Sequence, residues 1–181
     1  HKKDIGFGIE KGDHWIDFGA HIGCFSNKVQ RNHGTVVSIE PDYDNYLLLC
    51  ENVGKDNCKN VAVGSSNKIG NLVKGSKAYF NKVTDDPNGS LPIIAFNDLV
   101  TEGCCVKMDI EGAELDIIDH CDFSGIEKMV IAYHTNVDSS LANFHFRVAR
   151  LMKWFDVHHQ NITMDPINMF PNEIMIYCQK K

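Results

Sequence analysis

The sequence predicts an α/β fold in which a mostly parallel sheet is covered by helices on both faces and ends in an antiparallel pair of strands. Short apolar runs of strand length alternate with amphipathic segments of helix length. Polar turns rich in glycine or acidic residues follow several of these runs directly. The last two runs, residues 155–158 and 173–178, have no helical segment between them, and only antiparallel strands can be connected without a long crossover.

The first half of the chain alternates strand and helix over four segments. Apolar runs of strand length cover residues 14–18 and 35–39, and apolar residues at helical spacing predict helices over residues 22–31 and 42–54. Each strand ends at a short turn that opens the following helix. This order is typical of βαβ units, whose strands pair in parallel.

The stretch from residue 55 to residue 92 has the weakest pattern in the chain. Residues 64–75 are rich in Gly, Ser, Asn and Lys, which predicts a loop. Short strands are expected at residues 60–63 and 78–80, and a turn is expected at residues 85–90. A hairpin, a lid and a dimer contact all stay open for this stretch.

The alternation resumes after residue 92. We expect an apolar segment with a short helix at its end over 93–100, a strand over 104–110, a helix over 113–120, a strand over 128–133, and a helix over 139–155 capped by Asp138. Together the elements predict one α/β domain over residues 1–181. Because the chain starts at His1 rather than Met, a domain excised from a longer polypeptide also stays open.

The composition is that of an ordinary globular protein with an acidic balance. Hydrophobic residues make up 43% of the chain and charged residues 23%. No apolar run approaches the ~18–20 residues that cross a bilayer, so no membrane partner is expected. The net charge of -6 disfavours a nucleic acid as partner, because phosphate binding needs a basic face. A small molecule or a carbohydrate fits better, and the oligomeric state stays open.

The cysteines indicate a reducing environment. Seven of them are scattered along the chain without a Cys-x-x-Cys pair. An odd number without metal-site spacing predicts reduced thiols, which are typical of cytoplasmic proteins. We therefore expect a cytoplasmic protein without a structural zinc site.

A glycine turn follows the first strand, between Gly19 and Gly23. Glycine lets the backbone approach a ligand closely, and the helix that follows offers free N–H groups. The spacing differs from the dinucleotide fingerprint, and Asp17 stands directly before the turn, where a pyrophosphate would avoid its charge. A cationic ligand such as a sulfonium amino acid would tolerate this carboxylate. A purely structural turn is the alternative.

Glu40 ends the second strand. Glu40 stands 23 positions after Asp17, near the end of the first strand. In related folds, an acidic residue about twenty positions after the first strand binds two ribose hydroxyls. An exposed glutamate without a ligand is the alternative. The two acids at matching strand ends favour the binding of a nucleoside.

Charged residues gather at the end of the strand over residues 104–110. Because side chains alternate along a strand, Lys107, Asp109 and Glu111 point to one face. Charges at a buried strand end cost free energy unless they are paired or used, and open α/β sheets bind ligands at this edge. A Lys107–Asp109 pair with a helix-start glutamate is the structural alternative. Glu114 is interpreted as structural, because a carboxylate in the first helical turn suits the helix dipole.

His134 closes the next strand and lies at the same edge as Asp109 if the two strands are neighbours. A histidine there can act as a general base, a metal ligand or a hydrogen-bond partner of the substrate. A loop-end histidine without a role is the alternative.

Together these segments resemble the FkbM family of class I methyltransferases. The family motifs D-x-G-A-N-x-G, E-P and K-x-D-x-E-G-A-E are matched by residues 17–23, 40–41 and 107–114. His21 stands where the family has asparagine, and Tyr133 before His134 departs from an acidic-x-His pattern.

The resemblance implies a Rossmann-like class I methyltransferase fold, with a mostly parallel seven-stranded sheet whose last strand is antiparallel. It implies S-adenosylmethionine as cofactor and O-methylation, often of sugars. It implies that the cofactor-binding residues are Asp17, Phe18, Gly19, Ala20, His21, Gly23, Glu40, Pro41, Asp42, Val63 and Asp109.

Transfer of a methyl group to a hydroxyl requires removal of the hydroxyl proton. We expect His134 or Lys107 to help remove it, while Asp109 and Glu111 orient the acceptor. Asp109, Glu111 and His134 also offer oxygen and nitrogen ligands that suit Mg²⁺ or Mn²⁺, so a metal-dependent variant stays open.

Three other functions stay open. An RNA 2′-O-methyltransferase is disfavoured by the acidic balance and by the lack of an aromatic and basic stripe. A nicotinamide-dependent oxidoreductase is disfavoured by the glycine spacing and the antiparallel final pair. A non-catalytic module would bind S-adenosylmethionine without turning it over.

Overall fold

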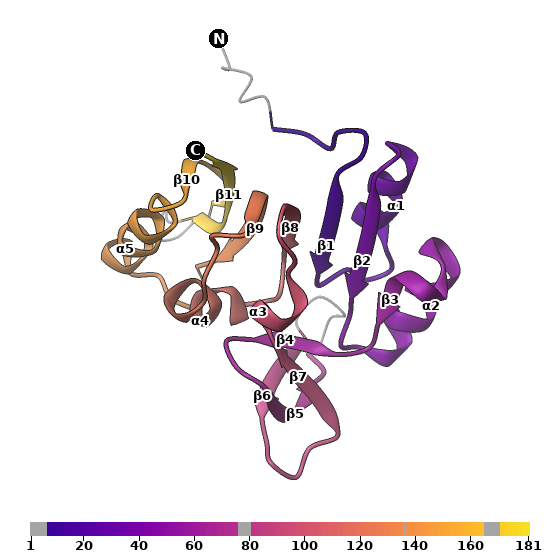
Figure 1. Ribbon diagram of the computed structural model, residues 1–181. Helices are drawn as coiled ribbons and strands as arrows, with labels where there is room; N and C mark the ends of the chain where they lie inside the picture. The colour runs from indigo at the N-terminus through magenta and orange to yellow at the C-terminus, as the bar shows by residue number, and fades with distance from the viewer. Residues whose placement is uncertain (1–6, 76–80, 136, 165–170) are drawn as a thin grey trace.

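Strands of one large sheet run through the centre of the molecule (Figure 1). The computed structural model describes residues 7–75, 81–135, 137–164 and 171–181, without the side chains of residues 161–164 and 171–172. Within this part of the chain the sheet has seven strands in the order β10-β11-β9-β8-β1-β2-β3. They are β1 (His14–Phe18), β2 (Thr35–Ile39), β3 (Cys58–Lys59), β8 (Cys104–Met108), β9 (Ile126–His134), β10 (Phe155–Met164) and β11 (Pro171–Lys180).

The large sheet is mostly parallel, as predicted. β1 pairs in parallel with β2 and β8, β2 with β3, and β8 with β9. β11 runs antiparallel to both β9 and β10, which confirms the expected antiparallel pair. β10 extends to Met164, past the expected end at residue 158, because it pairs with β11 along its length.

Helices cover both faces of the large sheet, which confirms the predicted layers. They are α1 (Cys24–Arg31), α2 (Tyr43–Val53), α3 (Phe96–Leu99), α4 (Ala113–His120) and α5 (Leu141–Leu151), with a 3₁₀ turn at Lys55–Asn57. Trp15 of β1 packs with Val29 of α1, whereas its neighbour Ile16 belongs to the cluster of Ile117 of α4 and Leu151 of α5. No helix in the described part of the chain is long and apolar enough to cross a membrane.

The expected N-cap of α5 is wrong by two residues. Ser140 is the cap, and its hydroxyl accepts a hydrogen bond from the N–H of Asn143 at 3.3 Å. Asp138 instead accepts from the N–H of Ser140 at 2.9 Å and from Arg147 at 2.8 Å. The Arg147 guanidinium therefore holds the Asp138 carboxylate before the helix, where it supports the turn.

A small second sheet projects from the end of the large one (Figure 1). Its strands are β4 (Ala62–Gly64), β5 (Lys68–Val73), β6 (Lys82–Asp85) and β7 (Leu91–Ala95), in the order β4-β7-β5-β6. β5 and β6 pair antiparallel, so the hairpin alternative for this stretch is confirmed. The strand expected at residues 78–80 lies outside the described residues.

The loop expected over residues 64–75 is wrong, because half of this segment, residues 68–73, is strand β5. Gly70 shows the reason. A Cβ at this position would overlap the carbonyl oxygen of Thr84 on β6, so glycine here allows two strands to approach closely. The same glycine that suggests a loop in the sequence is required inside the sheet.

Candidate active site

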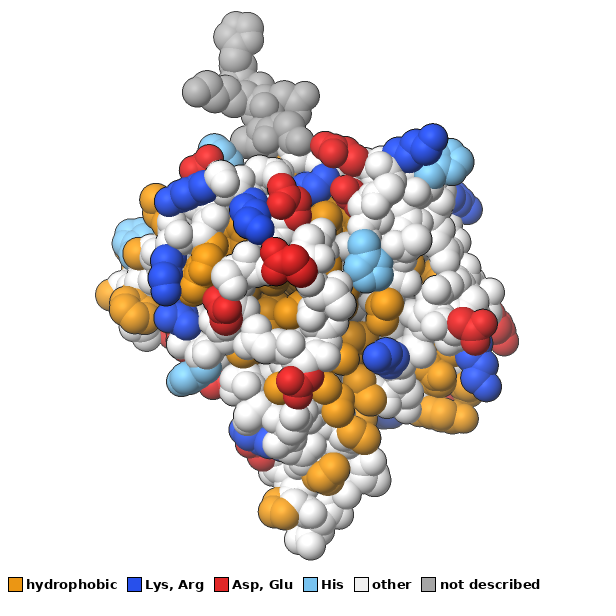
Figure 2. Space-filling model, viewed as in Figure 1, with side chains coloured by type: hydrophobic (Ala, Val, Ile, Leu, Met, Phe, Trp, Pro, Cys, Tyr) orange, Lys and Arg blue, Asp and Glu red, His pale blue; other side chains and the backbone are white. Residues whose placement is uncertain are grey.

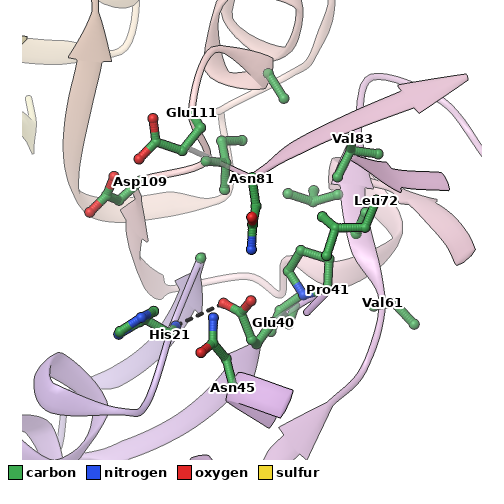
Figure 3. A pocket seen from close by; sticks show the side chains of 16 residues that line it. His21, Glu40, Pro41, Asn45, Val61, Leu72, Asn81, Val83, Asp109 and Glu111 are labelled. Atoms are coloured by element: carbon green, nitrogen blue, oxygen red, sulfur yellow. Dashed lines mark hydrogen bonds between the residues drawn. The ribbon is translucent and has the colours of Figure 1, made fainter. Parts of the chain in front are cut away.

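A cavity of about 390 Å³ opens at the carboxyl ends of β1, β2 and β8, and the small sheet forms its far wall (Figure 3). Open α/β sheets bind ligands at this edge. Among its lining residues, the sequence predicted Gly19, His21, Glu40, Pro41, Val63, Asp109 and Glu111.

Gly19 makes the turn that leaves room for the cavity. Its φ of 75° lies in the left-handed region, and a Cβ would overlap the carbonyl oxygen of Asp109. The N–H groups of Gly19 and Ala20 both donate to the carbonyl of Ile39 at 3.0 Å, which ties the turn to the end of β2. Any larger residue at position 19 would therefore push β1 and β8 apart.

Asp17 and Lys107 form a charged pair beneath this turn. Asp17 is fully buried, and its Oδ2 accepts a hydrogen bond from Ser26 Oγ at 2.6 Å. Its Oδ1 has the Lys107 ammonium at 3.2 Å as a counter-charge, although no hydrogen bond of good geometry reaches it among the described residues. Lys107 also donates to the carbonyl of Gly19 at 2.7 Å. Neither side chain lines the cavity, and both hold the turn from below.

Glu40 presents its carboxylate in the cavity wall although the residue is only 6% exposed. Oε2 accepts a hydrogen bond from the N–H of His21 at 2.8 Å (Figure 3). Oε1 accepts from the N–H of Asp42 at 3.0 Å. Burial raises the pKa of Glu40, and the backbone hydrogen bonds offset this only in part. The Asn45 side chain also hydrogen-bonds this carboxylate, whose two oxygens have about four acceptor sites, so capacity remains for a hydroxyl donor.

Four residues of the predicted cofactor set support the cavity from behind. Phe18 is fully buried in the core, and Ala20 packs against Leu49 of α2. Gly23 starts α1 with a φ of 93°, and a Cβ there would lie 2.9 Å from Leu49. Asp42 caps α2 with its side chain. A role of these four residues in cofactor binding stays a prediction.

The small sheet supplies an apolar wall that sequence reasoning missed. Leu72 of β5 and Val83 of β6 line the cavity together with Val61 (Figure 3). Asn81 also lines it, and its amide donates to Asp42 Oδ2 at 2.9 Å. Leu72 and Val83 are placed there by the pairing of β5 with β6 and with β7, which the weak sequence pattern of this stretch does not reveal.

Asp109 and Glu111 line the end of the cavity opposite this apolar wall, and His134 lies beside them without lining it. The two carboxylates follow β8, and the histidine ends β9, the neighbouring strand, as expected. His134 Nε2 lies 3.8 Å from Asp109 Oδ1 and 3.5 Å from Glu111 Oε2. One ligand atom of each residue lies within 4.8 Å of the others. Figure 3 shows Asp109 and Glu111 side by side.

Glu114 holds the histidine ring from behind. This residue is fully buried, and its Oε1 accepts hydrogen bonds from the backbone N–H of His134 at 2.8 Å and from Nδ1 at 2.9 Å. Its Oε2 accepts from the N–H of Gly112 at 2.7 Å. Because a carboxylate can only accept, Nδ1 donates to Glu114, and Nε2 faces the two other acids.

Negative charge dominates this end of the cavity. Burial of the ring lowers the pKa of His134, but the hydrogen bond to Glu114 and the charges of Glu114, Glu111 and Asp109 outweigh burial and raise the pKa to about 9. Burial raises the pKa of Glu111, whose backbone has a positive φ of 55°. Such strain in a residue other than glycine clusters at functional sites.

Comparisons with known proteins show the fold. No protein-family model and no curated protein matches the sequence. The fibrillarin pre-rRNA processing protein of Methanococcus jannaschii is 13% identical, with a TM-score of 0.55 over 96% of this chain and 69% of that one. A precorrin-6y C5,15-methyltransferase of Geobacter metallireducens is 12% identical, with a TM-score of 0.50 over 95% of this chain and 82% of that one.

The C-terminal domain of the precorrin-6Y C5,15-methyltransferase of Rhodobacter capsulatus is a third similar structure. It is 10% identical, with a TM-score of 0.50 over 95% of this chain and 82% of that one. At these identities the likeness concerns the fold. The chain therefore has the Rossmann-like α/β fold of class I methyltransferases, as predicted.

Proposed function

We propose that this protein is an S-adenosylmethionine-dependent O-methyltransferase, similar to the FkbM family, that acts on a hydroxyl of a sugar or another small molecule. The observation that carries the proposal is the cavity that joins Glu40, at the end of β2, to Asp109 and Glu111, after β8. A nucleoside held at the first end reaches the charged group at the second. The fold supports the proposal, because similar structures include methyltransferases by name.

The residues of the cavity fit S-adenosylmethionine. Gly19 leaves a space that a Cβ would fill, and Glu40 offers two acceptor oxygens to the ribose. Val61, Leu72 and Val83 form an apolar wall suited to an adenine ring. No Lys or Arg stands among the described lining residues, which favours a cationic cofactor over the pyrophosphate of a nicotinamide dinucleotide.

When bound, S-adenosylmethionine supplies a methyl group on a positively charged sulfur, which keeps the electron pair of the bond that breaks. The protein contributes alignment, which is worth up to ~7–11 kcal/mol in well-oriented reactions. It also provides the place where the acceptor hydroxyl is held and gives up its proton.

The geometry favours the carboxylates of Asp109 and Glu111 over Lys107 for this task. The raised pKa of His134 leaves its ring protonated near neutral pH and unable to take up the hydroxyl proton. The Lys107 ammonium is occupied by Gly19 and Asp17, and its side chain is 16% exposed. His134 Nε2 faces two carboxylates at the cavity's end. We therefore assign the acceptor hydroxyl to Asp109, Glu111 and His134, and we interpret Lys107 as a positioning residue.

The charge of the acceptor end favours a neutral acceptor. Glu173 of β11 pairs with His134 in the sheet and adds a fourth acid to Asp109, Glu111 and Glu114 at this end. On the face seen in Figure 2, the described basic side chains are interspersed with acidic ones. A phosphate-bearing RNA would be repelled at such a site. A polyhydroxyl compound carries no charge and would not be repelled.

Methyl transfer from S-adenosylmethionine labelled in its methyl group tests the proposal. The full chain is incubated with a panel of sugars and glycans and, separately, with RNA. We expect labelled methyl ethers on a sugar, lost in Glu40→Gln and kept in the control Glu51→Gln, whose side chain is exposed on α2. Label on RNA alone would favour the RNA methyltransferase, and binding without transfer to any acceptor would favour a non-catalytic module.

A further inference from the structure

The side chains around His134, at the end of the cavity, are arranged like the ligands of a bound cation. His134 is 8% exposed, and its Nδ1 is bound to Glu114, which leaves Nε2 as the ring nitrogen nearest the two other acids. The described neighbours of Nε2 are the carboxylates of Asp109 and Glu111, at 3.8 Å and 3.5 Å. One ligand atom of each of the three residues lies within 4.8 Å of the others, so a single cation can contact all three.

The ring is fixed in the orientation that a metal ligand needs. Metal-binding histidines donate their second N–H to a carboxylate, which sets the tautomer and the ring angle. Glu114 receives this hydrogen bond from Nδ1 at 2.9 Å and is itself fixed by the N–H of Gly112 at 2.7 Å. Glu114 is fully buried, so this support does not depend on solvent.

The two acids have the freedom to close on a cation. Their side chains are 44% and 31% exposed for Asp109 and Glu111 respectively. Donors at right angles around Mg²⁺, at about 2.1 Å from it, lie about 3 Å apart. The separations of 3.5 Å and 3.8 Å from Nε2 are slightly wider, and small rotations of the exposed carboxylates remove the difference.

We infer that Asp109, Glu111 and His134 bind one divalent cation at the acceptor end of the cavity, with Glu114 as the positioning residue. Carboxylates suit Mg²⁺ and Mn²⁺, whereas imidazole suits transition metals, so the mixed donor set favours Mn²⁺ over Mg²⁺. The inference rests on the proposed function for its purpose: a bound cation lowers the pKa of an oxygen ligand, here the acceptor hydroxyl.

Binding of Mn²⁺ to the chelator-treated full chain, followed by electron paramagnetic resonance, tests the inference without any turnover. We expect one Mn²⁺ per chain. Glu111→Gln and Asp109→Asn, which keep the side-chain shape, should each weaken binding by at least tenfold. Glu114→Gln should weaken it by about 10–100-fold, as removal of such supporting groups does. Glu51→Gln should bind Mn²⁺ like the original chain.

No binding of Mn²⁺ to the original chain, or equal binding to Glu111→Gln and Asp109→Asn, would overturn the inference. Calorimetric titration of S-adenosylmethionine into the metal-free chain separates this failure from a failure of the proposed function. S-adenosylmethionine binding without Mn²⁺ binding would overturn the metal site alone. Mn²⁺ binding without S-adenosylmethionine binding would leave the metal site standing and overturn the methyltransferase.

Discussion

The large sheet and the small sheet contribute to the same cavity in different ways. The large sheet places charged groups at strand ends: Asp17 is the next-to-last residue of β1, and Glu40 and Asp109 directly follow β2 and β8. The small sheet presents apolar side chains from Leu72 and Val83. The charged groups of the large sheet are held in place by buried ion pairs and tight turns. The apolar side chains of the small sheet contribute only a surface that fits the ligand. Substitutions in the large sheet should therefore affect folding and binding together, whereas substitutions in the small sheet should affect binding alone.

The largest effect should come from the buried charge pair of the large sheet. Lys107→Met leaves Asp17 buried without a counter-charge, so we expect the free energy of unfolding to fall by about 3–5 kcal/mol. Lys68→Met removes an exposed pair with Asp85 in the small sheet and should cost no more than about 1 kcal/mol. Urea denaturation of both variants measures the difference. Equal stabilities would remove the contrast between the sheets and restore Lys107 as a candidate base.

The glycine turn should give the next largest effect. Gly19→Ala adds left-handed strain of about 1–2 kcal/mol and an overlap with Asp109 that costs about 1–3 kcal/mol more. Gly103 is a matched control, because it has the same φ of 75° and a Cβ there meets no atom within 4 Å. In denaturation, Gly19→Ala should lose more free energy of unfolding than Gly103→Ala, because only the former creates an overlap. In calorimetry, only Gly19→Ala should lose S-adenosylmethionine binding. Normal binding by Gly19→Ala would place the cofactor elsewhere.

A third prediction concerns the ribose contact in the large sheet. Glu40→Gln keeps the side-chain shape but removes the charge, and a hydrogen bond to a charged group is worth about 1.5–3 kcal/mol. We expect the affinity for S-adenosylmethionine to fall by roughly 10–100-fold in calorimetry. Glu51→Gln serves as the control. An unchanged affinity would show that Glu40 only supports the turn through His21 and Asp42.

The same residue predicts a pH dependence. Because burial raises the pKa of Glu40, its carboxylate takes up a proton at a higher pH than an ordinary glutamate does when the solution is acidified. The affinity for S-adenosylmethionine should therefore fall as the pH is lowered through this raised pKa. Titrations over a series of pH values check this, and the acid-side loss of affinity should be absent in Glu40→Gln. The same loss in both proteins would assign the pH dependence to another group.

The smallest effect should come from the small sheet. Val83→Thr replaces a methyl group of the apolar wall by a hydroxyl, and we expect a few-fold loss of affinity with little change in stability. Val73→Thr makes the same change on β5 at a residue that is 53% exposed and does not line the cavity. Calorimetry on the two variants compares them. A large loss of stability in Val83→Thr would mean that the small sheet is as tightly coupled to the fold as the large one.

The contrast between the sheets also explains what the sequence could predict. Gly19, Glu40 and Asp109 were found because each stands directly after or at the end of an apolar run, and the ends of parallel strands meet at one edge. Leu72 and Val83 were missed because, within the described residues, β5 pairs with β6 and β7 in a separate sheet, so their position does not follow from the strand ends of the large sheet. Gly70 belonged to the glycine-rich pattern that predicted a loop instead of a strand.

Burial explains the remaining differences between the expected and the observed site. Asp17 matches the motif but is fully buried against Ser26 and Lys107, which residue types and spacing cannot show. The contact of Glu114 with His134 was likewise missed, because it joins α4 to the end of β9. The sequence therefore indicated which strand ends carry chemistry, but not which side chains face the ligand.

Calorimetric titration of the full chain with S-adenosylmethionine, S-adenosylhomocysteine and NAD tests the central claim, that the cavity between Glu40 and Asp109 holds a sulfonium nucleoside. The account predicts binding of the first two ligands at one site per chain and no binding of NAD, because Glu40, Asp109 and Glu111 make the cavity acidic. Binding of NAD alone, or of none of the three, would contradict it.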